Sequence, residues 1–257
     1  MSMRGISAGG RLQLAFFRHQ PDLVFPAIAG PVFTLIFLMV LRHAGRTDLG
    51  GYAVVAPILI TLWSFALLHG GAVIQRDRGA ETLELHAAAP TDFATVVFGR
   101  VLAVTAVGSL STVEIWLVAR YLLRARIAVY HPAVLGATVV ATAFAIAATA
   151  LLMAGLFVLA RSAITFSNTA TYPFYVLGGV LVPVALLPGW SHPVSRLVFL
   201  SWSADLLRAA LEPAPVPDAV ARVAAVVGLG CAELLLATAL MRRILGRLRH
   251  NGEMGLK

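Results

Sequence analysis

The stretch QRDRGAETLELHAAAPTDFATVVFGR, residues 75–100, is the longest charged interruption between two strongly apolar segments of the chain. It is dense in charge, although only 12% of all residues are charged. Residues 82–85 have the pattern of a short amphipathic helix, and Pro90 ends it because proline cannot continue the hydrogen-bond ladder. We therefore expect either a solvated hairpin that turns the chain or a docking element for a soluble partner.

The composition requires a lipid environment. Of the 257 residues, 59% are hydrophobic, and the mean hydropathy is +0.86. A soluble domain of this length could not bury so much apolar surface. The formal charge of +8 comes from arginines at the ends of apolar segments, and the only lysine is Lys257. This distribution indicates headgroup contact and membrane orientation, and it argues against nucleic acid as a partner. The single Cys231 excludes an intrachain disulfide.

The hydropathy pattern predicts an all-α integral membrane protein that forms one domain over residues 1–257. Residues 1–21 are expected to form an interfacial N-terminal helix, and residues 187–221 an outer insertion with an interfacial or re-entrant helix before the last span. The first span covers about 28 Å at 1.5 Å per residue, close to the thickness of the hydrocarbon core. We expect six transmembrane helices, at residues 23–41, 52–74, 101–122, 133–160, 169–186 and 223–245.

The distribution of basic residues predicts the orientation. With six spans both termini lie on one side, and twelve of the twenty Lys and Arg residues would lie on that side. The positive-inside rule then places both termini and residues 75–100 in the cytoplasm. We expect a multi-pass protein of the plasma (inner) membrane.

Motifs for chemistry are missing from the sequence. It has no Gly-x-x-x-x-Gly-Lys-Ser/Thr phosphate loop, no Gly-x-Ser-x-Gly elbow and no His-Glu-x-x-His. We expect no catalytic residue, no metal site and no cofactor bound by this chain. The ionisable residues within the predicted spans are Glu114, Arg120 and Glu233. They either hold a coupling proton or cationic substrate, or form neutral hydrogen bonds and ion pairs inside the protein.

The charged stretch resembles the cytoplasmic coupling segment of type-2 ABC exporter permeases. In that family glycine usually precedes the threonine directly, whereas here Glu81 does so and Gly79 lies two residues earlier. A second matching region is the fifth span with its following turn. The residues that carry the two similarities are Arg76, Arg78, Gly79, Thr82, Leu83, Glu84, Pro90, Gly99 and Arg100, and then Asn168, Pro173, Gly178, Gly179, Pro183 and Leu187 to Trp190.

The resemblance implies an ATP-driven exporter of a hydrophobic or amphipathic substrate such as a drug, lipid or glycan. It implies two separate ABC ATP-binding subunits, which hold ATP and Mg²⁺, and a second permease chain that is identical or a sister. Contact with the ATP-binding subunit would involve Arg76, Asp77, Arg78, Gly79, Glu81, Thr82, Leu83, Glu84 and Pro90. By analogy, spans two and five line the substrate pathway, with contacts from Trp63, Phe65, His69, Tyr172, Phe174 and Tyr175.

Two other functions remain open from the residues alone. A secondary transporter could couple to protons through Glu114 or Glu233, although the sequence has no inverted halves. An integral-membrane enzyme or assembly factor is the other alternative, and the absence of a catalytic motif argues against it.

Overall fold

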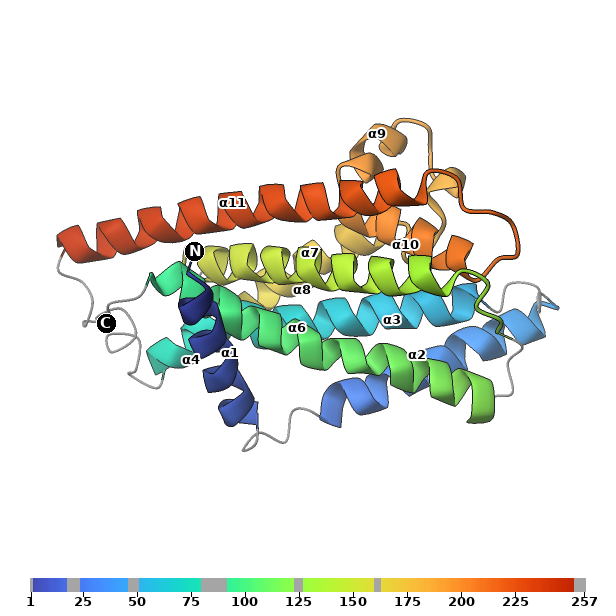
Figure 1. The fold of residues 1–257 in the computed structure, drawn as a ribbon, viewed down its shortest axis with the longest axis horizontal. Coiled ribbons are helices and arrows are strands. Elements are labelled where there is room, and N and C mark those ends of the chain that lie inside the picture. Colours follow the sequence, from blue (N-terminus) through green and yellow to red (C-terminus); the bar gives the residue numbers. More distant parts are fainter. Residues whose placement is uncertain are drawn as a thin grey trace.

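A computed structural model of the protein describes residues 2–17, 24–45, 51–79, 92–122, 127–159 and 163–251, and these residues form helices without strands (Figure 1). The elements are α1 (Met3–Phe17), α2 (Val24–His43), α3 (Tyr52–Phe65), the π-helix η3 (Ala66–Gly71), α4 (Val73–Gly79), α6 (Phe93–Leu117), the π-helix η4 (Val118–Leu122), α7 (Pro132–Leu159), α8 (Ala163–Leu177), the 3₁₀ turn η5 (Val184–Leu186), α9 (Ser191–Arg196), α10 (Phe199–Ala210) and α11 (Ala219–Asn251).

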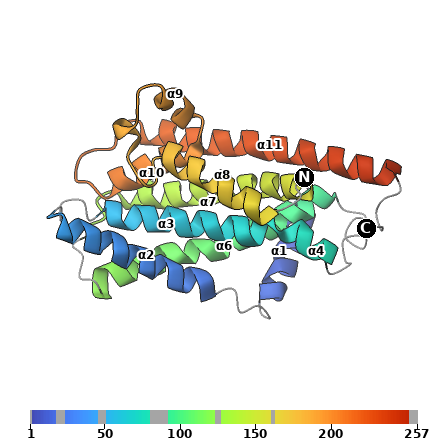
Figure 2. The same ribbon diagram turned by 180° about the vertical axis from the view of Figure 1, so that it is seen from behind.

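The long helices lie along one common direction, and short helices gather at the two ends of the bundle (Figures 1 and 2). Helices α1 and α4 and the C-terminal end of α11 lie at one end, which we call the α1 end. Helices α9 and α10 lie at the other, which we call the α10 end. Helix α1 crosses α6 rather than running alongside it.

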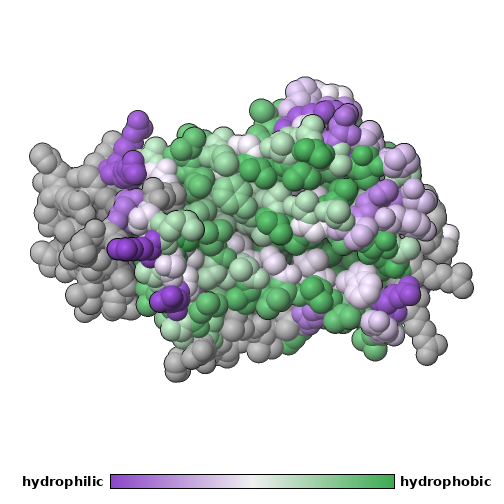
Figure 3. All heavy atoms as spheres, viewed as in Figure 1, coloured by the Kyte–Doolittle hydropathy of each residue, from purple (hydrophilic) through white to green (hydrophobic). Residues whose placement is uncertain are grey.

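Four helical stretches of the described chain are long and apolar enough to cross a membrane: Ala53–Asp77, Phe93–Leu122, Pro132–Phe157 and Ala219–Ile244. A shorter apolar helix covers Ile28–His43. Apolar residues cover the middle of the face drawn in Figure 3, and hydrophilic residues gather toward its two ends. The all-helical membrane class is confirmed. The count of six spans and the interfacial placement of α1 and α10 remain predictions.

Helix α7 is the centre of the packing, since α6, α10 and α11 all pack against it. Small side chains on α7 allow this, because alanine lets neighbouring backbones approach closely. Ala145 is fully buried, and a Cβ atom built on Gly230 of α11 would lie 3.0 Å from its Cα atom. The α7–α11 contact is therefore close packing of two backbones.

The helices differ from the predicted spans at several boundaries. Helix α4 continues to Gly79 and α6 begins at Phe93, so residues 80–92 of the charged stretch lie between the two helices. Helix α8 begins at Ala163 and ends at Leu177, before the predicted end at residue 186. Gly179 explains the early end, because its φ of +63° is incompatible with a continuing helix.

The outer insertion also differs in detail. Where one helix is predicted within residues 187–221, the structure has two, α9 and α10, separated by Leu197 and Val198. The last helix begins at Ala219, four residues before its predicted start.

Candidate functional site

The most buried ion pair of the described chain lies at the α1 end. The Arg100 guanidinium of α6 faces the Asp77 carboxylate of α4, and both residues are at most 6% exposed. The Nε of Arg100 also donates to Oε1 of Gln13 on α1 at 3.1 Å. Three elements therefore meet at one arginine, which we call the Arg100 junction (Gln13, Asp77 and Arg100). Removing either partner of such a buried pair strongly lowers the stability of the fold, because the remaining charge stays buried without a partner.

Close backbone contact brings α1 to this junction. The buried residues of α1 recur every four positions, at Gly5, Gly9, Gln13 and Phe17, which is one face of a helix. A Cβ atom on Gly9 would overlap the carbonyl oxygen of Val96 in α6. Sequence reasoning missed this face, although the spacing of Gly5 and Gly9 is typical of closely packed helices in membranes.

The partner glycine lies on α6 itself. A Cβ atom on Gly99 would overlap the carbonyl of Ile6 in α1. Gly99, one of the residues that carry the family resemblance, is therefore needed for packing in this chain. Without a side chain it lets α1 approach closely enough for Gln13 to reach Arg100. Gly99 and Arg100 act together, one providing space and the other the hydrogen bond.

The π-helix η3 lies directly before α4, within the same membrane-crossing stretch. Wider turns of this kind leave carbonyl groups without their usual helical donors. Arg76 supplies donors, since its Nη2 lies 2.9 Å from the Leu68 carbonyl oxygen and 3.3 Å from that of His69. Arg76 therefore folds back on the helix of span two.

His69 connects the π-helix to α1 through ring contacts. Its ring centroid lies 4.4 Å from that of Phe65 and 6.3 Å from that of Phe17, the last residue of α1. His69 is buried, with 1% of its surface exposed. Helix α1 is thus joined to span two in two places. One is the ring contact of Phe17 with His69, and the other is the Arg100 junction.

A weaker, exposed contact lies at Asp92, just before α6 begins. Asp92 precedes α6 and accepts a hydrogen bond from the Thr95 hydroxyl at 2.9 Å. Its carboxylate also lies 3.9 Å from a guanidinium nitrogen of Arg242 on α11. Both partners are substantially exposed, and such pairs contribute little stability.

The predicted coupling residues separate into two groups. Arg76 and Asp77 point into contacts within this chain, and Gly79 is exposed at the end of α4. Arg78 belongs to α4, but its side chain is not among those the structure describes. Glu81, Thr82, Leu83, Glu84 and Pro90 lie outside the described residues.

Five of the six residues predicted to line a substrate pathway fall into two clusters, and Tyr172 lies apart from both. The first joins α3 to α8: the rings of Trp63 and Phe174 lie 4.9 Å apart, and Trp63 Nε1 donates to Thr171 Oγ1 at 3.3 Å. The hydroxyls of Ser64 and Tyr175 lie 2.9 Å apart. Helices α3 and α8, which lie in the predicted spans two and five, are thus neighbours through aromatic and polar contacts.

The other predicted pathway residues lie elsewhere. Phe65 and His69 face α1 and α6, together with Phe17 and Val104. Tyr172 is 68% exposed on the surface of α8. Within one chain these side chains therefore do not share a single wall, and their contact with substrate remains a prediction.

Replacing Tyr175 by phenylalanine should lower the free energy of unfolding by about 1 kcal/mol, because it removes a buried hydroxyl that bonds to the Ser64 hydroxyl and to the Ile60 carbonyl oxygen. Tyr172→Phe is the matched control, since its side chain is exposed, and it should leave stability unchanged. Thermal unfolding of the two purified variants in detergent measures the difference. Equal stability of the two variants would contradict the role assigned to the Ser64–Tyr175 contact.

The ionisable groups of the predicted spans have different surroundings. Glu233 of α11 accepts a hydrogen bond from the Thr149 hydroxyl of α7, within the close α7–α11 contact. Glu114 is partly exposed on α6, and Arg120 is exposed in η4. No ion pair joins Glu114 to Arg120 in the described part of the chain. The Thr149 contact shows that Glu233 is hydrogen-bonded within the chain, and both the packing and the proton-carrying interpretations remain predictions.

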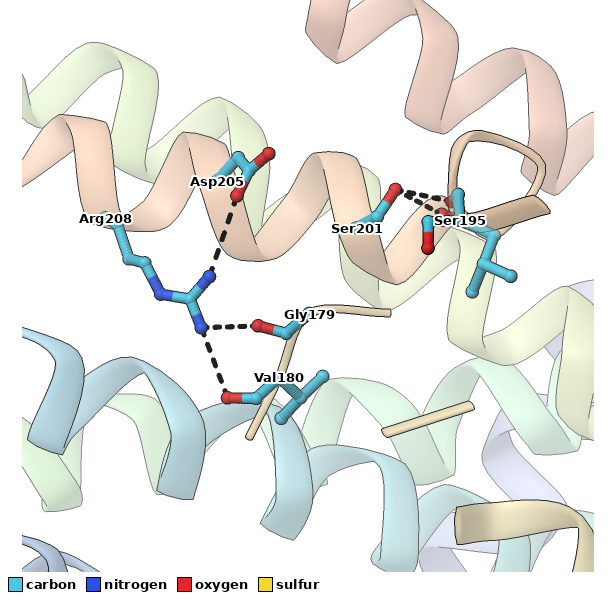
Figure 4. Close-up of polar contacts among 7 residues, drawn as sticks. Gly179, Val180, Ser195, Ser201, Asp205 and Arg208 are labelled. Atoms are coloured by element: carbon cyan, nitrogen blue, oxygen red, sulfur yellow. Dashed lines mark hydrogen bonds and ion pairs between the residues drawn. The ribbon is translucent and has the colours of Figure 1, made fainter. Parts of the chain in front are cut away.

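The outer insertion is held by a buried arginine (Figure 4). Arg208 of α10 donates to the carbonyl oxygens of Gly179 and Val180, at 2.5 and 3.2 Å, just after α8 ends. It also lies 3.6 Å from the Asp205 carboxylate. Burial raises the pKa of Asp205, and nearby arginines, first of all Arg208, oppose that shift. Arg208 therefore stabilises the chain reversal that ends α8 early.

A comparison with protein families places these features in context. The model of a family described as ABC-2 type transporter matches residues 10–211, from α1 through α10. The match contains the Arg100 junction, the π-helix and the outer insertion. A comparison with curated proteins gave no match.

Proposed function

Because the chain belongs to the ABC-2 type transporter family, we propose that it is the membrane-spanning permease of an exporter powered by separate ATP-binding subunits. As a member of this family it is a transport subunit of a multi-pass membrane complex. Two copies of the ATP-binding subunit would work with two permease chains, either identical or paired with a sister chain. ATP and Mg²⁺ would bind to the ATP-binding subunits.

The observation that carries the proposal is the Arg100 junction. It lies where residues 80–91 leave α4, on the side of the bundle where α1 also lies. A soluble subunit that presses on this segment would meet α4 first. Because Asp77 contacts Arg100 and Arg100 contacts Gln13, displacement of α4 would also act on α6 and α1.

A second path leads from the same segment into span two. Arg76 holds the carbonyl groups of the π-helix, so a shift of α4 would alter the turn around His69. π-helical turns often occur at functional sites because they can change their hydrogen-bond pattern at modest cost. Tilting of α3 against α8 would then open the pathway outward. Aromatic side chains on these helices suit a hydrophobic or amphipathic substrate.

Charge reversal in the segment that leaves α4 tests the contact with the ATP-binding subunit. We expect the double variant Arg78→Glu, Glu84→Arg to lose at least ten-fold in ATP-dependent export from reconstituted vesicles and to co-purify poorly with the ATP-binding subunit. Arg76 and Asp77 are left unchanged because their contacts lie within the chain. Arg243→Glu, an exposed charge on α11 at the same end, is the control and should export normally.

Two outcomes would contradict the proposal. Unchanged export and co-purification of the double variant would remove the coupling role of residues 78–84. Export that persists without ATP and collapses when the proton gradient is dissipated would instead favour a secondary transporter.

A further inference from the structure

Helices α7 and α11 lie side by side and run in the same direction (Figures 1 and 2). We call their contact the α7–α11 seam. The residues that meet in it, in order, are Ala145 with Gly230, Thr149 with Glu233, and Gly155 with Leu240. Helix α7 has no charged residue between Pro132 and Leu159. Glu233 is therefore the one ionisable group among these paired residues, and it lies between two levels of close apolar packing.

Glu233 lies near the middle of the membrane-crossing stretch of α11. The stretch Ala219–Ile244 has 26 residues, about 39 Å at 1.5 Å per residue, against about 30 Å of hydrocarbon. In a centred helix Glu233 is then about 12 Å inside the nearer boundary of the hydrocarbon. An ionised carboxylate at this depth is costly unless a cation or several hydrogen bonds compensate its charge.

No described cation compensates a charge on Glu233. The elements that pack against α11 are α6, α7 and α10. Apart from Glu233, the charged side chains described on α6, α10 and α11 are Arg100, Glu114, Asp205, Arg208, Arg222, Arg242 and Arg243. None of them forms an ion pair with Glu233. Along α11 the nearest arginine, Arg242, is about 13 Å away and pairs with Asp92.

The Thr149 hydroxyl has two acceptors within reach but only one proton. It contacts Oε2 of Glu233 and lies 3.0 Å from the carbonyl oxygen of Ala145, one turn earlier on α7. If Thr149 donates to a Glu233 carboxylate, a charge remains at this depth with one described hydrogen bond. If Thr149 donates to Ala145, the hydrogen bond to Glu233 requires a proton on the carboxyl group. In that second arrangement both contacts are hydrogen bonds and no charge is buried.

We propose that Glu233 is a proton-binding site in the α7–α11 seam. Its protonated carboxyl group donates to Oγ1 of Thr149, and the Thr149 hydroxyl donates to the Ala145 carbonyl oxygen. Two successive hydrogen bonds thus join α11 to the backbone of α7 without a charge. The site goes beyond the proposed function, which does not involve α11.

The surroundings of Glu233 indicate that the proton stays bound. On the side of α11 that faces the bundle, the neighbouring buried residues are Val226, Gly230, Ala237 and Met241. These residues have no ionisable side chain to which Glu233 could pass its proton. The bound proton therefore holds α11 against α7 and is not exchanged during transport.

Infrared spectroscopy of the chain in lipid membranes at neutral pH tests the bound proton, because a protonated carboxyl group and a carboxylate absorb at different frequencies. We expect the wild type to show one protonated carboxyl band that is lost in Glu233→Gln. Glutamine has a similar size and an N–H group that can donate to Thr149, so the seam is retained. Glu114→Gln, at the other glutamate of the predicted spans, is the control and should leave this band in place.

Two threonines of α7 test the hydrogen bond. Thr149→Val removes the hydroxyl that contacts Glu233 but keeps the size of the side chain, so the carboxyl band should persist and move in frequency. Thr138 is also buried on α7, and its Oγ1 has no hydrogen-bond partner in the described chain. Thr138→Val is therefore the matched control and should leave the band unmoved. This comparison needs no variant of Glu233, so it remains decisive if Glu233→Gln does not fold.

Three results would overturn the proposal. A spectrum of Glu233→Gln that lacks no protonated carboxyl band of the wild type would show that Glu233 is ionised. A band that behaves alike in Thr149→Val and Thr138→Val would exclude Thr149 as its partner. A Glu233 band that disappears during ATP hydrolysis by the assembled transporter, or when a proton gradient is imposed, would show a coupling proton in place of a retained one.

Discussion

Replacing Arg100 by methionine should lower the free energy of unfolding by about 3–5 kcal/mol. Methionine fills similar space but removes the guanidinium that faces Asp77 at a site where both residues are almost fully buried. Loss of one partner from a buried ion pair has this magnitude because the remaining charge keeps its desolvation cost. Unfolding of the purified chain in mixed detergent micelles, followed by its helical signal, measures the change.

An exposed pair provides the matched control for this prediction. Arg242 of α11 and Asp92, which precedes α6, also form an arginine–aspartate pair, but their side chains are 66% and 39% exposed. Arg242→Met should therefore cost less than about 1 kcal/mol. Combining Asp77→Asn with Arg100→Met should recover part of the stability, since no buried charge of the pair is left. Equal losses at Arg100 and Arg242 would contradict the importance of burial.

Substituting alanine for Gly9 should destabilise the protein by about 1–3 kcal/mol and release α1 from α6. The added Cβ atom would overlap a backbone carbonyl, that of Val96, which cannot move away by a change of rotamer. Alanine has a higher helix propensity than glycine by about 1 kcal/mol, but this gain does not offset a backbone overlap. Trypsin should cleave the released α1 at Arg11 faster than in the wild type.

Gly10, next to Gly9 on α1, provides the matched control for this prediction. A Cβ atom on Gly10 would lie 3.6 Å from the carbonyl oxygen of Gly99, an ordinary contact. Gly10→Ala should thus be neutral or slightly stabilising, with α1 protected from trypsin as in the wild type. Equal stability and equal trypsin cleavage of the two alanine variants would contradict the idea that close backbone contact holds α1 against α6.

The two arginine sites suggest a common arrangement at opposite ends of the bundle. Arg100 joins α4 and α1 to α6 at the α1 end, and Arg208 joins α10 to the residues after α8 at the other end. Each buried arginine joins elements that are distant in the sequence. Arginine is suited to this role because its guanidinium donates several hydrogen bonds in fixed directions.

Part of the candidate site could be predicted from the sequence. The charged stretch at residues 75–100 identified the region of Asp77 and Arg100, and the aromatic residues of spans two and five included the cluster of Trp63, Phe174 and Tyr175. Sequence reasoning did not predict that Asp77 faces Arg100, nor that Gln13 completes the junction. Gln13 lies 87 residues from Arg100, and no local pattern connects them.

The sequence by itself determined what depends on the transfer of local segments into lipid: the membrane class, the helical secondary structure and the approximate positions of the apolar stretches. Hydropathy and charge act over one helix at a time, so they can be summed along the chain. Only the tertiary structure decided which helix faces meet, where α8 ends and which charges are buried as pairs. These depend on contacts such as Gly99 against Ile6 and Arg208 against Gly179, which form only when distant helices pack together.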